Sequence, residues 1–97
     1  MDCLVINVSS AQSRMDFMAD QILKLGLSFE RLEAVTPGMI SNTQGHRYWD
    51  TWERPMKDTE KACFLSHLEA WKKVSLGERP VLILEDDTLL SRHVPRL

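Results

Sequence analysis

The spacing of apolar residues predicts a strand and then a helix in the first quarter of the chain. Residues 4–8 form an almost unbroken apolar run, which predicts a buried strand. A helix is expected from Ser13 to about residue 25, because apolar residues then recur every three or four positions and Gly26 provides a stop. Ser13, with Asp16 three residues later, predicts a capping box at the start of this helix. The apolar stripe comprises Met15, Met18, Ile22 and Leu25.

A second strand and a long segment without periodicity follow. Residues 29–34 alternate weakly and predict a less buried strand, which completes a β-α-β unit. Residues 36–58 contain several turn signals, and a loop of this length in a small domain is expected to be functional or disordered. Its aromatic and basic residues suit a sugar or a nucleotide, with Arg47 as a candidate cofactor-binding residue. Alternatively, its tryptophans cover the edge of the core.

A second helix is predicted over residues 59–76. Thr59 is expected to be its N-cap, and Glu60 complements the helix dipole in the first turn. His67 lies beside the apolar face, where a histidine is either a hydrogen-bonded core residue or a site residue. The predicted apolar face comprises Phe64, Leu68 and Trp71.

The most informative stretch is an apolar run that ends in three acidic residues. Residues 81–84 predict a strand that is buried on both faces, as in a parallel sheet. Glu85, Asp86 and Asp87 would then lie at the carboxyl end of this strand, where open α/β sheets bind ligands. Adjacent carboxylates repel one another unless a cation joins them, so a divalent metal with a phosphate behind it is one interpretation. Acids solvated at a turn are the other.

Arg14 is a second charged residue with two interpretations. It falls at the start of the first predicted helix, where the helix dipole disfavours a cation. It could be solvated beside Asp16 or Asp20. It could instead meet a phosphate that binds at the same helix end.

Composition predicts one small globular domain. The chain has 97 residues, of which 43% are hydrophobic and 27% charged. Its net charge of −2, without a basic tract, gives no sign of a nucleic-acid partner. A cytoplasmic location is expected, because the N-terminus does not resemble a signal peptide and no apolar run is long enough to span a membrane. Cys3 and Cys63 lack metal-binding spacing and are expected to be reduced thiols in the core.

Several separated blocks resemble glycosyltransferase family 25, which includes bacterial lipooligosaccharide and lipopolysaccharide galactosyltransferases and relatives that glycosylate collagen. Residues 4–35 resemble the N-terminus of these proteins. Residues 60–71, EKACFLSHLEAW, are similar to a family block of the form E-x-A/G-C-x-x-S-H-x-x-x-W. Residues 81–87, VLILEDD, resemble the strand that leads into the family's acidic motif. The blocks follow the family's order and cover nearly all of the chain.

The resemblance implies a partial GT-A type, Rossmann-like α/β sheet with the order β-α-β-loop-α-β. It implies a transferase that moves a sugar, galactose from UDP-galactose, to a lipooligosaccharide or lipopolysaccharide acceptor at the cytoplasmic face of the inner membrane. Asp86 and Asp87 would hold Mn²⁺ or Mg²⁺, which would bridge the donor diphosphate. Asn7, Arg14, Ser66 and Glu85 are further candidates for binding the donor, and His67 is a candidate catalytic residue.

The chain stops ten residues after Asp87, whereas family members continue well past the acidic motif. Residues 1–97 are therefore expected to be the N-terminal, nucleotide-sugar-binding part of a transferase, which would be inactive alone. An exposed edge on the third strand would favour self-association. Two alternatives are a non-catalytic nucleotide- or metal-binding module and a receiver-like phosphoacceptor domain.

Overall fold

A computed structural model of the chain describes residues 1–39 and 57–96. It confirms the predicted α/β class and the order of the three strands and two helices, and adds two short 3₁₀ helices. The strands are β1 (Cys3–Asn7), β2 (Phe29–Glu33) and β3 (Leu82–Glu85). The helices are α1 (Gln12–Lys24), α2 (Asp58–Ser75), η1 (Pro37–Met39) and η2 (Val94–Arg96).

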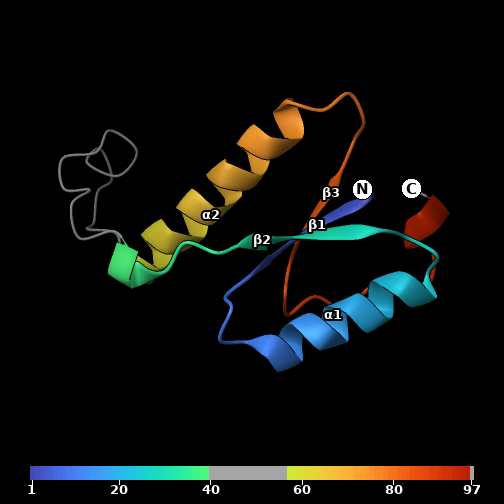
Figure 1. The fold of residues 1–97 in the computed structure, drawn as a ribbon, viewed down its shortest axis with the longest axis horizontal. Helices are drawn as coiled ribbons and strands as arrows, with labels where there is room; N and C mark the ends of the chain where they lie inside the picture. Colours follow the sequence, from blue (N-terminus) through green and yellow to red (C-terminus); the bar gives the residue numbers. More distant parts are fainter. Residues whose placement is uncertain (40–56, 97) are drawn as a thin grey trace.

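The three strands form one parallel sheet in the order β2-β1-β3 (Figure 1). Cys3 at the start of β1 is in register with Phe29 on β2 and Leu82 on β3. All five residues of the central strand β1 are buried, as the apolar run at residues 4–8 predicts. Parallel pairing brings the carboxyl ends of all three strands to one edge of the sheet, which is where the acidic residues lie.

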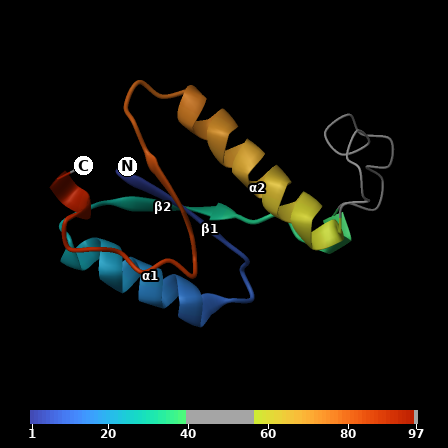
Figure 2. The ribbon, with the colours of Figure 1, turned by 180° about the vertical axis from the view of Figure 1, so that it is seen from behind.

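Each face of the sheet is covered by one helix (Figures 1 and 2). On one face, Met15, Met18 and Ile22 of α1 pack on Cys3 and Val5 of β1. This contact confirms most of the stripe that the helical spacing predicts. On the other face, the α2 core residue Ala70 joins a cluster that comprises Leu4, Ile6 and Ala34. The chain therefore forms three layers, helix on sheet on helix, and each face of β1 contributes to its own small core.

Strand β3 is less buried than its apolar sequence predicts. Leu84 is 7% exposed, but Leu82 is 37% exposed and Glu85 is also exposed. The prediction of a strand buried on both faces was therefore wrong for β3, although it holds for β1. The physical reason is position: β3 pairs only with β1 among the described residues, so one of its sides has no neighbouring strand.

The helix starts and the packed face of α2 also differ from prediction. No side-chain cap forms at Ser13, because α1 already begins at Gln12. Thr59 is not an N-cap, since α2 begins at Asp58, and the Lys57 backbone N–H donates to the Glu60 carboxylate at 3.3 Å. The face of α2 that packs on the sheet consists of small residues, and Trp71 on the predicted apolar face is 51% exposed. The buried residues are Ala62, Ser66 and Ala70.

The predicted long loop lies mostly outside the described residues, and so do the candidate Arg47 and the loop's tryptophans. Neither of the two described α-helices is both long and apolar enough to cross a lipid bilayer.

Candidate functional site

The carboxyl edge of the sheet borders a cavity of about 230 Å³. Strand β1, the turn after β3 and helices α1 and α2 all contribute side chains to its wall. The cavity is lined by every described residue that was predicted to bind the sugar donor or the metal, so the fold brings these candidates together. The lining residues are Ile6, Asn7, Val8, Arg14, Ala34, Val35, Pro37, Thr59, Ala62, Cys63, Ser66, Glu85, Asp86 and Asp87.

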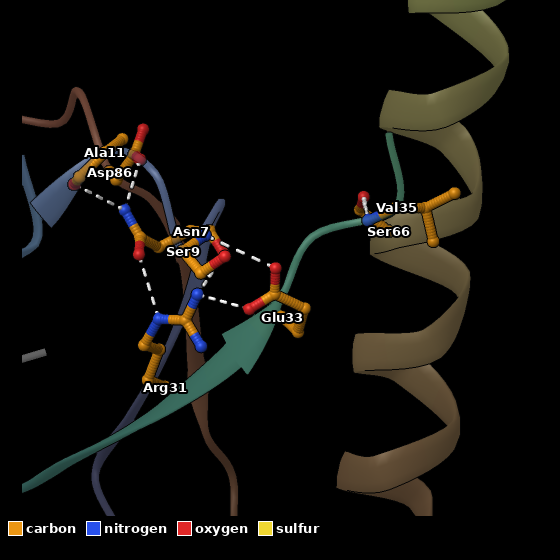
Figure 3. A network of polar contacts seen from close by, with 8 residues as sticks. All are labelled: Asn7, Ser9, Ala11, Arg31, Glu33, Val35, Ser66 and Asp86. Carbon is orange, nitrogen blue, oxygen red and sulfur yellow. Dashed lines mark hydrogen bonds and ion pairs between the residues drawn. The ribbon is translucent and has the colours of Figure 1, made fainter. Parts of the chain in front are cut away.

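Asn7 is the polar centre of this edge. It is only 2% exposed, and its side-chain Nδ2 donates to Asp86 Oδ2 at 2.7 Å and to the Ala11 carbonyl at 3.1 Å. Its Oδ1 accepts a hydrogen bond from Arg31 Nε at 2.8 Å, and its main-chain carbonyl accepts one from Arg31 Nη2 at 3.0 Å. Figure 3 shows the amide between these partners. One buried side chain thus joins β1 to β2 and to the acidic turn, and fixes the position of Asp86.

Arg31 and Glu33 on β2 extend this network, and sequence reasoning missed both. Arg31 Nη2 pairs with the Glu33 carboxylate, which also accepts a hydrogen bond from the Ser9 backbone N–H at 3.3 Å (Figure 3). The Arg31 hydrogen bond, and then that from Ser9, hold the pKa of Glu33 below its usual value. The alternation of β2 was the available signal, because it puts both residues on the same face as Phe29, which packs on the α1-side core.

Arg14 lies beside Asp86. Its Nε is 3.4 Å from Asp86 Oδ2, and the two side chains are 56% and 12% exposed. The alternative positions beside Asp16 or Asp20 are wrong, since Asp16 accepts from Gln12 at 2.8 Å and Asp20 pairs with Lys24 at 2.9 Å. The carboxylate of Asp86 is therefore held between a buried amide and a guanidinium at the start of α1.

Glu85 and Asp86, two of the three consecutive acids, have different partners. Glu85 Oε1 lies 3.4 Å from Cys63 Sγ and 3.4 Å from His67 Nε2 on α2, whereas Asp86 faces Asn7. Asp87 is exposed in the turn. Separate partners for Glu85 and Asp86 relieve the mutual repulsion of these neighbouring carboxylates.

Cys63 is not in the core, contrary to prediction, whereas Cys3 is fully buried. Cys63 is exposed and donates its thiol hydrogen bond to Glu85 at 3.4 Å. Partial burial, then this hydrogen bond and the negative charge of Glu85, raise the pKa of the Cys63 thiol. Sequence reasoning found no metal-binding spacing, but Cys63 precedes His67 by four residues, which places the two on one helix face.

Ser66 is 3% exposed and its hydroxyl joins α2 to the chain after β2. The hydroxyl donates to the Ala62 carbonyl at 2.8 Å. It accepts a hydrogen bond from the Val35 backbone N–H at 2.9 Å, and Figure 3 shows both of these residues. These contacts give Ser66 a structural role at the cavity wall. Its predicted role in donor binding stays a prediction, as does the catalytic role of His67.

A further residue that the sequence did not indicate, Gln21 on α1, anchors the chain after the acidic turn. Its Nε2 donates to the Thr88 carbonyl at 2.9 Å, and its Oε1 accepts a hydrogen bond from the Leu90 backbone N–H at 2.8 Å. The Thr88 hydroxyl in turn donates to the Glu85 carbonyl at 2.8 Å. Both sides of the turn that carries Asp86 and Asp87 are thus tied to the core.

A small three-stranded parallel sheet with one helix on each face, and polar and acidic side chains at its carboxyl edge, is compatible with part of a Rossmann-like α/β fold. The chain belongs to glycosyltransferase family 25, described as lipopolysaccharide biosynthesis proteins, whose model matches residues 1–96. The receiver-like alternative is therefore wrong.

Relatives from bacteria and animals align with most of the chain. The lacto-N-neotetraose biosynthesis glycosyltransferase LgtB of Neisseria meningitidis serogroup B is 31% identical, with 89% of this chain and 32% of the relative aligned. The lipooligosaccharide biosynthesis protein lic2B of Haemophilus influenzae is 27% identical over 95% of this chain and 35% of its own length. Procollagen galactosyltransferase 1-B of Xenopus laevis is 29% identical, with 89% of this chain and 16% of the relative aligned. The chain thus spans about a third or less of the length of these relatives.

Proposed function

We propose that this chain forms the donor-binding part of a GT-A type glycosyltransferase that transfers galactose from UDP-galactose to a lipooligosaccharide or lipopolysaccharide acceptor. The observation that carries the proposal is the Asn7–Asp86–Arg14 cluster, which is built at the carboxyl edge of a parallel sheet and opens on a cavity. The choice of sugar and acceptor is supported by the names of the relatives, a galactosyltransferase and two proteins of oligosaccharide biosynthesis. A glycolipid acceptor favours action in the cytoplasm, at the inner face of the membrane.

Asp86 and Asp87 fit a divalent cation such as Mn²⁺ or Mg²⁺. Both offer hard carboxylate oxygens, and these cations prefer such ligands together with phosphate. Asp86 is 12% exposed and held by Asn7, so one ligand is already positioned, while Asp87 next to it is open to solvent. When bound, the cation would offset the negative charge of the departing diphosphate.

The chain's own residues would orient the donor. Arg14 uses Nε toward Asp86, and a guanidinium has further N–H groups that can bind phosphate oxygens. The first turn of α1 adds backbone N–H groups, because these lack helical partners at a helix start. Asn7 would act indirectly, by positioning the acidic turn relative to β2. Its side-chain Nδ2 donates to Asp86, and its side-chain and main-chain oxygens accept hydrogen bonds from Arg31.

Calorimetric titration with UDP in the presence of Mn²⁺ tests the proposal. We expect saturable binding that depends on the metal and weakens about tenfold or more in Arg14→Gln, because a hydrogen bond to a charged group is worth about 1.5–3 kcal/mol. Asp20→Asn is the matched control, since Asp20 is an exposed α1 side chain paired with Lys24 and away from the cavity. Equal affinities in the wild type and Arg14→Gln, or binding that is unchanged without a metal, would overturn the proposal.

The donor sugar is tested in the same way. UDP-galactose should compete with UDP more effectively than UDP-glucose or UDP-N-acetylglucosamine. Equal competition by all three would contradict the assignment of galactose while leaving the nucleotide site intact.

A further inference from the structure

Three side chains with different ligand atoms meet on the α2 side of the acidic turn. Cys63 and His67 lie one helical turn apart on α2, and Glu85 is the last residue of β3. Glu85 Oε1 is 3.4 Å from Cys63 Sγ and 3.4 Å from His67 Nε2, and all three ligand atoms lie within 4.8 Å of one another. Two elements that are distant in sequence therefore bring a sulfur, a nitrogen and an oxygen to one point.

These distances are close to those of a tetrahedral metal site. Zinc binds sulfur at about 2.3 Å and nitrogen or oxygen at about 2.0–2.2 Å, which separates tetrahedral ligand atoms by roughly 3.3–3.6 Å. Both distances to Glu85 Oε1 fall in this range. The remaining pair, the Cys63 sulfur and a ring nitrogen of His67, is at most 4.8 Å apart, so a modest approach of these two side chains closes the site.

The ligand set favours a thiophilic cation. A thiolate and an imidazole prefer Zn²⁺ or Co²⁺ to Mg²⁺ or Mn²⁺, which prefer oxygen ligands. Three protein ligands also leave a fourth position open, as in many reactive zinc sites. Access from solvent is free, because the side chains of His67 and Glu85 are 30% and 51% exposed and Cys63 is exposed as well.

We propose that Cys63, His67 and Glu85 form a binding site for Zn²⁺ or a similar thiophilic divalent cation. The cation takes the place of the thiol proton that Cys63 shares with Glu85, and that proton leaves to solvent. Binding fastens α2 to the carboxyl end of β3. The acidic turn then serves two different cations, with Glu85 turned to the sulfur-containing site and Asp86 and Asp87 left for the oxygen-binding one. This site does not depend on the proposed transferase function.

Titration of the 97-residue chain with Co²⁺, followed by absorption, tests the site. A tetrahedral cobalt–thiolate complex has a sulfur-to-metal charge-transfer band in the near ultraviolet, and this band should appear with one equivalent and disappear when Zn²⁺ is added. Cys63→Ser should abolish the band, and His67→Gln and Glu85→Gln should each weaken binding at least tenfold. Glu69→Gln is the matched control, an exposed acid on the same helix that pairs with Lys72, and should leave the titration unchanged.

Alkylation of the thiol provides a second measurement. Saturating Zn²⁺ should slow the reaction of Cys63 with iodoacetamide at least tenfold, whereas the same concentration of Mn²⁺ should not. Absence of the cobalt band, its persistence in Cys63→Ser, or equal alkylation with and without Zn²⁺ would overturn the proposal. The UDP calorimetry uses Mn²⁺ and Arg14→Gln, so failure of one proposal is distinguishable from failure of the other.

Discussion

At the scale of single residues, the site depends on one buried amide. Asn7 is 2% exposed and would be costly to bury without partners, yet its side chain and carbonyl make hydrogen bonds to Asp86, Ala11, Arg31 and Ala34. The sequence alone indicated Asn7 only through the family resemblance. Its contact with Asp86 joins residues that are 79 positions apart, so it depends on the pairing of β1 with β3 and cannot be read from local spacing.

Cys3 provides a prediction about pH. Burial, and then the charge of Asp2, raise the pKa of the Cys3 thiol above its ordinary value of 9.0. The folded chain therefore keeps this proton at pH values where the unfolded chain has released it, and the free energy of unfolding should fall as the pH rises above 9.0. Cys3→Ala should show a shallower fall than the wild type in urea denaturation series.

The two proteins are compared by how steeply the free energy of unfolding falls with pH. Their absolute stabilities are not compared, because Cys3→Ala also leaves a small cavity in the core. Other groups that titrate in alkali are shared by both proteins and cancel in the difference. Identical slopes in the two proteins would show that the buried thiol does not contribute.

At the scale of elements, the hydrophobic pattern predicted the type and order of the strands and α-helices, the burial of β1 and the packed face of α1. It did not predict the exposure of β3 or the packed face of α2. The apolar runs of β1 and β3 look alike, yet β1 is central and β3 lies at an edge of the described sheet. Strand order depends on which strands pair, and single-sequence patterns do not contain that information. On α2 the large residues indicated one face, whereas the helix packs through small ones, which allow it to approach the sheet closely.

Ser66 tests the attachment of α2. In Ser66→Ala the part-buried Val35 backbone N–H loses its partner, and a typical hydrogen bond contributes about 0.5–1.5 kcal/mol, so the free energy of unfolding should fall by that amount. Ser75→Ala is the matched control, because its hydroxyl also donates to a carbonyl of the preceding turn but is exposed. Its effect should stay within about 0.5 kcal/mol.

Chemical denaturation of both variants measures whether the Ser66 hydroxyl holds α2 to the chain after β2. Equal effects of the two substitutions would show that the hydroxyl of Ser66 does not hold the helix to the strand. Such a result would favour the role of Ser66 in donor binding that the resemblance implies.

At the scale of the whole molecule, the two edges of the described sheet differ in character. Edge strand β2 carries charged residues, among them Glu30, Arg31 and Glu33, which discourage pairing with another chain. Edge strand β3 has the sequence LILE, with Leu82 37% exposed. We propose that any self-association of the chain proceeds through β3.

Sedimentation measurements over a range of protein concentrations test whether the chain self-associates through β3. Leu82→Lys should shift the chain toward monomer, since a lysine on an edge strand opposes pairing. Leu89→Lys is the control, because Leu89 is 79% exposed but lies outside the strands. An association that is equally sensitive to both substitutions, or to neither, would place the contact elsewhere.

We propose above all that the carboxyl edge of this sheet binds a nucleotide diphosphate with a divalent cation. Nuclear magnetic resonance titration of the isotope-labelled chain with UDP and Mg²⁺ tests it most directly. We predict saturable, metal-dependent shifts at the amides of Asn7, Arg14, Asp86 and Asp87, with Leu27 and Val94 at the opposite end of the sheet unaffected. Absence of a saturable shift at the first four residues, or equal shifts at both ends, would contradict it.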